Sequence, residues 1–118
     1  MDGGKDAKDL PGLSPDSCIA VLMTFASTEE AGRIGALLVE ERLVACINLI
    51  SNVRSLFFWD NALQDASEVL AVAKTTAARL DAVISRVQST HSYSVPEVIA
   101  LPIVGGSAPY LQWVRTGV

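Results

Sequence analysis

The stretch LVACINLISNVRSLFFW, Leu43–Trp59, is rich in Val, Ile, Leu and Phe, and SEVLAVAKT, Ser67–Thr75, follows a few residues later. Strands favour the β-branched and aromatic residues among these. Ser51-Asn52 interrupts the first stretch, which reads either as one long strand with a bulge or as two short strands in line. Asp60-Asn61 predicts the turn between the stretches. The sequence therefore predicts a long antiparallel hairpin in the middle of the chain.

A strand and a helix precede this hairpin, and a helix and a strand follow it. Ser27 with Glu30 three residues later is a capping-box signature, and the helix that it starts ends near Arg42. The other predicted segments are the strand Cys18–Ala26, the second helix Thr76–His91, the strand Glu97–Val104 and a short C-terminal helix after Ser107, with Pro109 in its first turn. The order βαββαβ plus a last helix predicts an α+β fold, one antiparallel sheet with two helices on one face.

The composition predicts one domain in 118 residues, since half of the residues are hydrophobic and domains of this size are common. Residues 1–16 mix Gly, Pro, Asp and Lys without periodicity, which predicts a disordered tail before a domain at 17–118. No apolar run reaches the 18 or so residues of a membrane span, and the first residues lack the apolar stretch of a signal peptide. We therefore expect a cytoplasmic protein without a membrane partner.

The net charge and the two cysteines indicate which partners and which redox state to expect. A net charge of −4 without a cluster of Lys or Arg argues against nucleic acid as a partner. Cys18 and Cys46 could form at most one disulfide, and reduced thiols are the simpler expectation.

The first and fourth strands are apolar on both faces. Ile19 and Val21 alternate with Ala20 and Leu22, and Ile99 alternates with its apolar neighbours. Two helices cover only one side of a sheet, so the other side would expose large apolar side chains. Leaving about six of them in water would forgo on the order of 10 kcal/mol. The pattern predicts an oligomer.

His91, the only histidine, opens HSYSVPEVIALP at a helix-to-strand junction. It is in step with Leu80, Val83 and Val87 on the apolar stripe of the second helix, so we expect it on the last turn, facing the sheet. At this place an imidazole either caps the helix C-terminus or takes part in a site.

Four blocks of the chain resemble the CutA family of divalent-cation tolerance proteins: ERLVACINLI, SLFFWDNALQDASEV, HSYSVPEVIALPI and APYLQWV, within Cys18–Arg115. The resemblance implies a homotrimer of a ferredoxin-like fold, similar in architecture to PII-type signalling proteins. It also implies a non-enzymatic role in tolerance of copper and other divalent metal ions. The alternatives are a PII-like small-molecule sensor and a trimeric scaffold, with an unknown ligand bound in inter-subunit clefts.

The resemblance also suggests metal ligands. Some family members carry a Cys where this chain has Met23 and a second His where it has Thr90. The remaining set is His91, Met23 and Glu97, which predicts weak binding of Cu²⁺ or another divalent cation. In the family's turn after the Trp, Gly and Lys are common, whereas Asn61 and Ala62 stand here; Asn tolerates positive φ, so the hairpin is expected to persist.

Further side chains are candidates for the clefts between subunits. Cys46 reads as a small buried hydrophobe or a ligand, and Asn48 on the same face needs a hydrogen-bond partner. Lys74 either extends along its strand end or faces a polar cleft. The full set is Cys46, Asn48, Trp59, Glu68, Lys74, Tyr93 and Trp113. A hydrolase with Cys46 or Ser92 as nucleophile and His91 as base lacks a nucleophile elbow, so we do not expect an enzyme.

Overall fold

The computed structural model describes residues 12–118. Its elements follow the predicted order, and the chain ends in the expected short helix. They are β1 (Cys18–Phe25), α1 (Thr28–Glu40), β2 (Cys46–Trp59), β3 (Ala62–Thr76), the 3₁₀ turn η2 (Ala77–Arg79), α2 (Leu80–Thr90), β4 (Val98–Pro102) and α3 (Ala108–Thr116).

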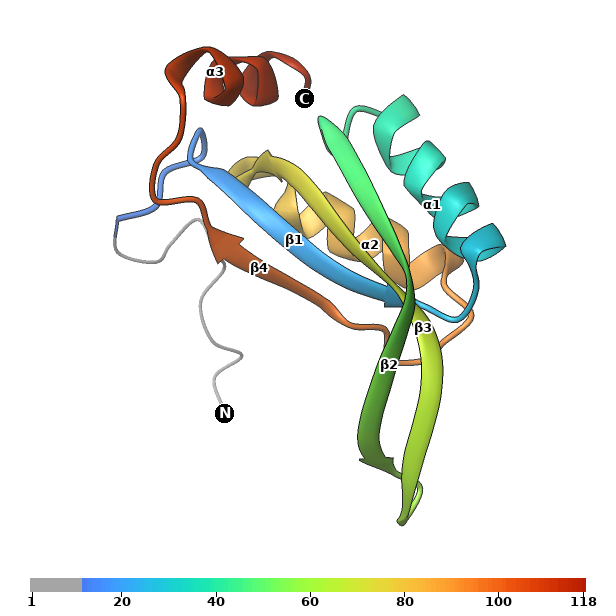
Figure 1. Ribbon diagram of the computed structural model, residues 1–118. Coiled ribbons are helices and arrows are strands. Elements are labelled where there is room, and N and C mark those ends of the chain that lie inside the picture. Colours follow the sequence, from blue (N-terminus) through green and yellow to red (C-terminus); the bar gives the residue numbers. More distant parts are fainter. Residues whose placement is uncertain (1–11) are drawn as a thin grey trace.

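The four strands form one sheet in the order β2-β3-β1-β4, and every neighbouring pair is antiparallel. Helices α1 and α2 lie side by side behind this sheet, and α3 lies beyond its end (Figure 1). This arrangement confirms the α+β fold with one antiparallel sheet, two helices on one face and an extra C-terminal helix.

The hydrophobic core lies between the sheet and the two helices. Alternate residues of β1, from Ile19 to Phe25, are fully buried there, because successive side chains of a strand point to opposite faces. The helices contribute the residues that recur every three or four positions. The largest core side chains are Ile19, Val21, Met23, Phe25, Ile34, Leu38, Val83 and Val87.

The hairpin of β2 and β3 is long and extends away from the helices (Figure 1). Its register shifts between Ile50 and Val53, and Asn52 has φ 62°, so β2 is one strand with a bulge rather than two short strands. Asp60 and Asn61 form the two-residue turn with φ 53° and 62°. Positive φ at both positions is what a type I′ turn requires.

Helix α1 begins and ends on local signals. The amide of Glu30 donates to the Ser27 hydroxyl at 3.1 Å, as the N-cap prediction requires. At the other end Arg42 has φ 57°, and the amide of Leu43 donates to the carbonyl of Leu38 at 2.9 Å. This is a Schellman motif with a non-glycine residue in its left-handed position.

Several predicted boundaries differ from the structure. Strand β2 begins at Cys46 rather than at Leu43, and β3 begins at Ala62 rather than at Ser67. The segment after β3 first forms a 3₁₀ turn at Ala77–Arg79, so α2 begins at Leu80 rather than at Thr76. Strand β4 spans Val98–Pro102 instead of Glu97–Val104, since it pairs only with Ile19–Met23 of β1.

Residues 1–11 of the predicted tail lie outside the described residues. The rest of that segment contacts the domain: the amide of Ala78 donates to the carbonyl of Pro15 at 3.0 Å. Arg115 Nε donates to the carbonyl of Asp16, also at 3.0 Å. Contacts with the folded body therefore begin before residue 17, where the sequence analysis placed the domain boundary.

The second face of the sheet carries no helix over most of its area. Ile99 and Leu101 of β4 are about half exposed on it, as the two-faced apolar pattern predicts. Helix α3 lies over one end of this face, where Cys18 Sγ is 3.7 Å from the Leu111 carbonyl. We call this surface the open face.

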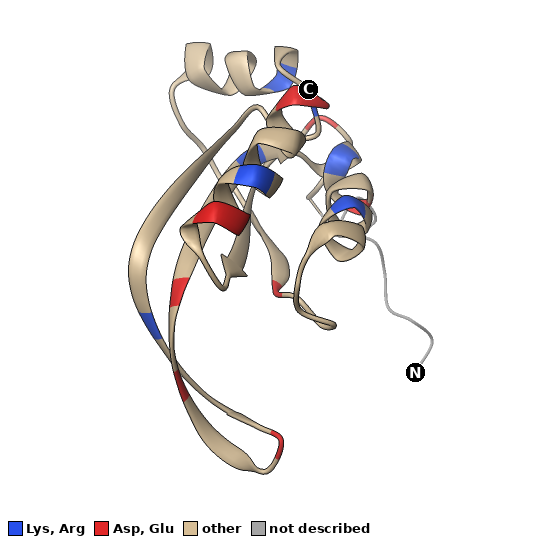
Figure 2. Cartoon of the chain, turned by 90° about the vertical axis from the view of Figure 1, so that its right-hand side faces the viewer, with Lys and Arg blue, Asp and Glu red and all other residues tan. Residues whose placement is uncertain are grey.

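Charged residues are scattered over the helices and the hairpin without a cluster of one sign (Figure 2). Among residues 12–118, no helix is both long enough and apolar enough to cross a membrane.

Candidate functional site

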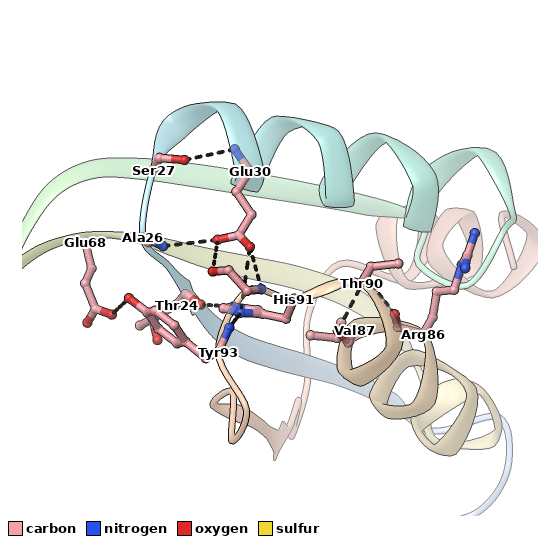
Figure 3. A network of polar contacts seen from close by, with 11 residues as sticks. Thr24, Ala26, Ser27, Glu30, Glu68, Arg86, Val87, Thr90, His91 and Tyr93 are labelled. Atoms are coloured by element: carbon pink, nitrogen blue, oxygen red, sulfur yellow. Dashed lines mark hydrogen bonds and ion pairs between the residues drawn. The ribbon is translucent and has the colours of Figure 1, made fainter. Parts of the chain in front are cut away.

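The His91 side chain is completely buried at the end of α2 and uses both ring nitrogens (Figure 3). Nε2 lies 2.7 Å from the carbonyl of Thr24, and Nδ1 lies 3.0 Å from the amide of Tyr93. A carbonyl accepts and an amide donates, so the contacts specify a neutral ring with its proton on Nε2. The prediction that His91 faces the sheet is confirmed.

The ring completes the edge of the sheet. Strand β4 pairs with β1 only as far as Met23 and Val98, and the His91 ring donates to the next carbonyl of β1, that of Thr24. Phe25 stacks on the imidazole with ring centroids 4.9 Å apart, and Tyr93 lies on it at 4.7 Å. Thr90 turns back and donates to the Arg86 carbonyl at 2.8 Å, within its own helix.

Glu30 connects α1 to the segment after α2. Its carboxylate accepts hydrogen bonds from the Ser92 amide at 2.7 Å, the Ser92 hydroxyl at 3.1 Å and the Ala26 amide at 3.4 Å. Burial opposes its ionisation, but the hydrogen bonds, those from Ser92 above all, outweigh that effect and lower the pKa of Glu30. Oε2 is 3.9 Å from His91 Nδ1.

Tyr93 connects the segment after α2 to the β2–β3 hairpin. Its hydroxyl donates to Glu68 Oε2 at 2.7 Å, and Glu68 is itself buried. Burial, this hydrogen bond and the charges of Glu68 and Glu30 raise the pKa of Tyr93 to about 12. The phenol therefore remains a donor across the physiological range. We call Glu30, Glu68, His91, Ser92 and Tyr93 the junction network.

The junction network reaches the surface at an open depression of about 380 Å³ beside the start of α1. Its lining residues are Ala26, Ser27, Glu29, Glu30, Arg33 and Ser92. Glu30 and Ser92 belong both to the junction network and to the lining of the depression. A solute bound in the depression would therefore contact these two residues before the rest of the network.

The predicted metal ligands do not form a preformed site. Met23 is fully buried in the core, Glu97 is exposed before β4, and both nitrogens of His91 are engaged. Residues 12–118 hold no group of three His, Cys, Asp or Glu side chains placed to share an ion. These donors do not fit a resident metal ion, because a cation could reach His91 only by displacing the Tyr93 amide or the Thr24 carbonyl.

The hydrolase geometry is also not formed. The Ser92 hydroxyl contacts Glu30 rather than His91, and Cys46 Sγ contacts Tyr110 Oη at 3.5 Å. Neither nucleophile candidate is hydrogen-bonded to the imidazole, which general-base activation would require.

The remaining predicted residues gather at a second location, on the open face near α3. Lys74 Nζ donates to Asn48 Oδ1, and Cys46 lies directly opposite Lys74 across the two strands. Trp113 on α3 packs beside Tyr110, with ring centroids 5.6 Å apart. Glu68 is not part of this location, because its carboxylate contacts Tyr93 in the junction network.

Trp59 stands apart from both locations, at the far end of the hairpin, where it is 58% exposed. Sequence reasoning missed the role of Glu30 in the junction network and that of Tyr110 beside Cys46. The capping-box signature did single out Glu30. In the structure, however, its carboxylate accepts from Ser92 and from the amide of Ala26, the residue before the N-cap.

Comparison with known proteins gives one consistent family. The family model described as CutA1 divalent ion tolerance protein matches residues 19–117. Protein CutA of Homo sapiens is 42% identical over 104 residues, 88% of this chain and 58% of that protein. The divalent-cation tolerance protein CutA of Thermus thermophilus is 41% identical over 95 residues, 80% of this chain and 92% of that protein.

The solved structures agree with the sequence matches. CutA1 from Oryza sativa superimposes with a TM-score of 0.84 at 37% identity, covering 86% of this chain and 93% of that one. This chain spans little more than half of the human protein.

Proposed function

This chain belongs to the CutA1 family of divalent ion tolerance proteins, and from that membership we propose that it acts in divalent-cation tolerance as a non-enzymatic homotrimer. In this proposal the trimer binds Cu²⁺ weakly at the junction network, in the cytoplasm. The open face and the hairpin support the assembly, and the proximity of His91 to Glu30 supports a weak cation site.

The observation that carries the proposal is the amount of exposed apolar surface on the hairpin and the open face. Four hairpin side chains are between 58% and 72% exposed, and two on β4 are about half exposed. Covering all six would contribute on the order of 5–10 kcal/mol per subunit. Large apolar side chains that are exposed side by side on a single chain, as Phe58 and Leu63 are, mark an interaction surface. The six side chains are Leu56, Phe58, Trp59, Leu63, Ile99 and Leu101.

The hairpin of β2 and β3 also needs a partner for its own stability. An isolated two-stranded hairpin is marginally stable in water, and this one extends beyond the helices that would cover it (Figure 1). Both of its faces are apolar, with Phe58 and Leu63 paired on one and Trp59 on the other. A second copy of the chain that packs on the hairpin would cover these faces.

The cation would bind where an imidazole and a carboxylate already lie close together. His91 Nδ1 and Glu30 Oε2 are 3.9 Å apart. Copper accepts both donor types, but two ligands hold an ion weakly. The Tyr93 amide must also lose its acceptor when the ion binds, which lowers the affinity further.

Sedimentation equilibrium tests the assembly. We expect about three times the 12.5 kDa chain mass at micromolar concentration. Phe58→Ser combined with Leu63→Ser should shift the distribution toward smaller species, whereas Ser55→Ala on the same strand should not. A stable monomer of the wild-type chain would refute the proposed assembly.

Calorimetry with copper(II) chloride on untagged protein tests the cation site. His91 is the only imidazole of the chain, so His91→Ala should abolish the binding, and nitrogen coupling in the copper spin-resonance spectrum should disappear with it. Glu30→Gln keeps the ring and should weaken the binding. Glu97→Gln is the control, because its exposed carboxylate makes no contact with the network. Unchanged binding in His91→Ala would assign His91 a purely structural role.

A further inference from the structure

Lys74 places a positive charge on the open face of the sheet. Lys74 is half-buried and lies near the end of β3, two residues after Val72. Its ammonium group donates to Asn48 Oδ1. The ion pairs found within residues 12–118 are Arg54–Asp65 and Arg86–Glu41, and Glu30 lies near the imidazole of His91. In that part of the chain, no carboxylate lies within ion-pair distance of Lys74.

The groups around Lys74 come from three elements. Register places Cys46 opposite Lys74, and Asn48 lies two residues further along β2 on the same face. Tyr110 of α3 reaches over this position and contacts Cys46, while Trp113 packs beside Tyr110. Helix α3 thus forms one wall of a corner whose floor is the open face.

The corner is rich in hydrogen-bond donors. Lys74 has three N–H bonds, of which Asn48 Oδ1 takes one, and the amide nitrogen of Asn48 offers two more. The Tyr110 hydroxyl faces the same side. The hydrogen bond with Cys46 and partial burial raise the pKa of Tyr110, so the phenol remains a donor. One positive charge and several donors, without a facing carboxylate, match an anion rather than a cation.

We propose that Lys74, Asn48 and Tyr110 form a binding site for a small oxyanion, a carboxylate or a phosphate group. The ammonium group supplies the charge, the Asn48 amide and the phenol supply directed hydrogen bonds, and the aromatic rings of α3 bound the site. This site is separate from the junction network. It rests on the proposed homotrimer only because a neighbour that covers the open face would bury Lys74 further.

A neighbouring copy that covered the open face would make a counter-charge necessary. It would remove the ammonium group of Lys74 from water, and the neutral Asn48 oxygen would compensate only part of the cost of burying that charge. The oxyanion has two possible sources: a free ion from solution, or a carboxylate of the neighbouring copy. Both would make the same contacts.

The matched variant for the test is Asn48→Asp. This substitution keeps the size of the side chain and gives Lys74 a carboxylate partner within the same chain. Lys74 should then no longer need an external anion. Lys74→Met removes the charge, and Lys74→Arg keeps it. Asn48 is exposed and Lys74 lies on the surface of the isolated chain, so these variants should fold, which circular dichroism checks.

The first arm is calorimetry of inorganic phosphate and of acetate, with sodium chloride at equal ionic strength as the control. A free ion predicts saturable binding to the wild type and to Lys74→Arg. The affinity should fall about tenfold or more in Lys74→Met and in Asn48→Asp, as loss of a charge-assisted hydrogen bond implies.

The second arm is sedimentation of the same proteins. If the anion is a carboxylate of the neighbouring copy, phosphate should show no saturable binding. The trimer should then be weaker in Lys74→Met and in Asn48→Asp, so that it dissociates at a higher protein concentration than the wild type does. If neither variant changes anion binding or assembly, the proposal is wrong. A monomeric wild type that still binds phosphate would refute the homotrimer and leave the anion site standing.

Discussion

Replacing Glu30 by Gln should destabilise the protein far more than the same change at the adjacent Glu29. Glu30 is 7% exposed and accepts three hydrogen bonds, whereas Glu29 is exposed. Both residues lie in the first turn of α1, where a negative charge stabilises the helix by about 0.3–1 kcal/mol. Glu29→Gln therefore measures the helix-dipole contribution alone.

The additional cost follows from the contacts. In Glu30→Gln the amide oxygen can take the place of Oε2 and still accept from the Ser92 amide. The amide nitrogen then faces the Ala26 N–H, a donor against a donor. A buried donor without a partner costs about 1–3 kcal/mol, and the other bonds lose the strength that the charge gave them. We expect a total loss of about 2–4 kcal/mol at neutral pH.

The effect should depend on pH with a defined sign. The folded state lowers the pKa of Glu30 below its ordinary value of 4.5, so its contribution is complete above that value. The contribution is lost as the pH falls through the lower, folded pKa. The difference between wild type and Glu30→Gln should therefore be largest near pH 7 and shrink in acid.

Urea unfolding at one fixed protein concentration measures this, since the stability of an oligomer depends on concentration. Fluorescence and circular dichroism should report the same midpoint. Equal losses for Glu29→Gln and Glu30→Gln, or a Glu30→Gln loss that persists unchanged into acid, would refute the assigned role of the carboxylate.

Two further outcomes concern the ends of elements. Arg42→Gly should raise the free energy of unfolding by about 1 kcal/mol, because glycine adopts the left-handed conformation at φ 57° without steric cost; a lower urea midpoint would contradict this. Removing residues 1–11, whose composition offers little to bury, should leave the melting temperature unchanged. Removing residues 1–16 should lower it, since Ala78 and Arg115 lose their backbone acceptors; identical melting of both truncations would show that these contacts contribute nothing.

The hairpin was predictable because its signals are local. Asn52 and Asp60-Asn61 are residue types that tolerate positive φ, and each lies where the structure has a bulge or a turn. The flanking apolar stretches fix the strands between them. The one choice that the sequence left open, a bulge or a break at Ser51-Asn52, depended on whether β3 is long enough to pair on both sides, and it is.

The junction network was only partly predictable because its contacts are distant in sequence. Periodicity placed His91 on the buried side of α2, but its partner Thr24 lies 67 residues away, and Ser92 is 62 residues from Glu30. Met23 was a candidate ligand because the family resemblance aligned it with a Cys. Alternation along the strand did not say which face the helices cover, and in the structure the face of Met23 is the core.

Strand β3 carries one residue of each location, Glu68 in the junction network and Lys74 beside α3. Six residues of extended chain separate them by about 20 Å, which exceeds the Debye length at physiological salt. Substitutions at such a distance usually add independently. Within one chain, therefore, a cation at His91 and an anion at Lys74 should not influence each other directly. Since the hairpin and the open face are the surfaces proposed to meet in the homotrimer, any coupling between the two ligands would have to pass through the neighbouring copy.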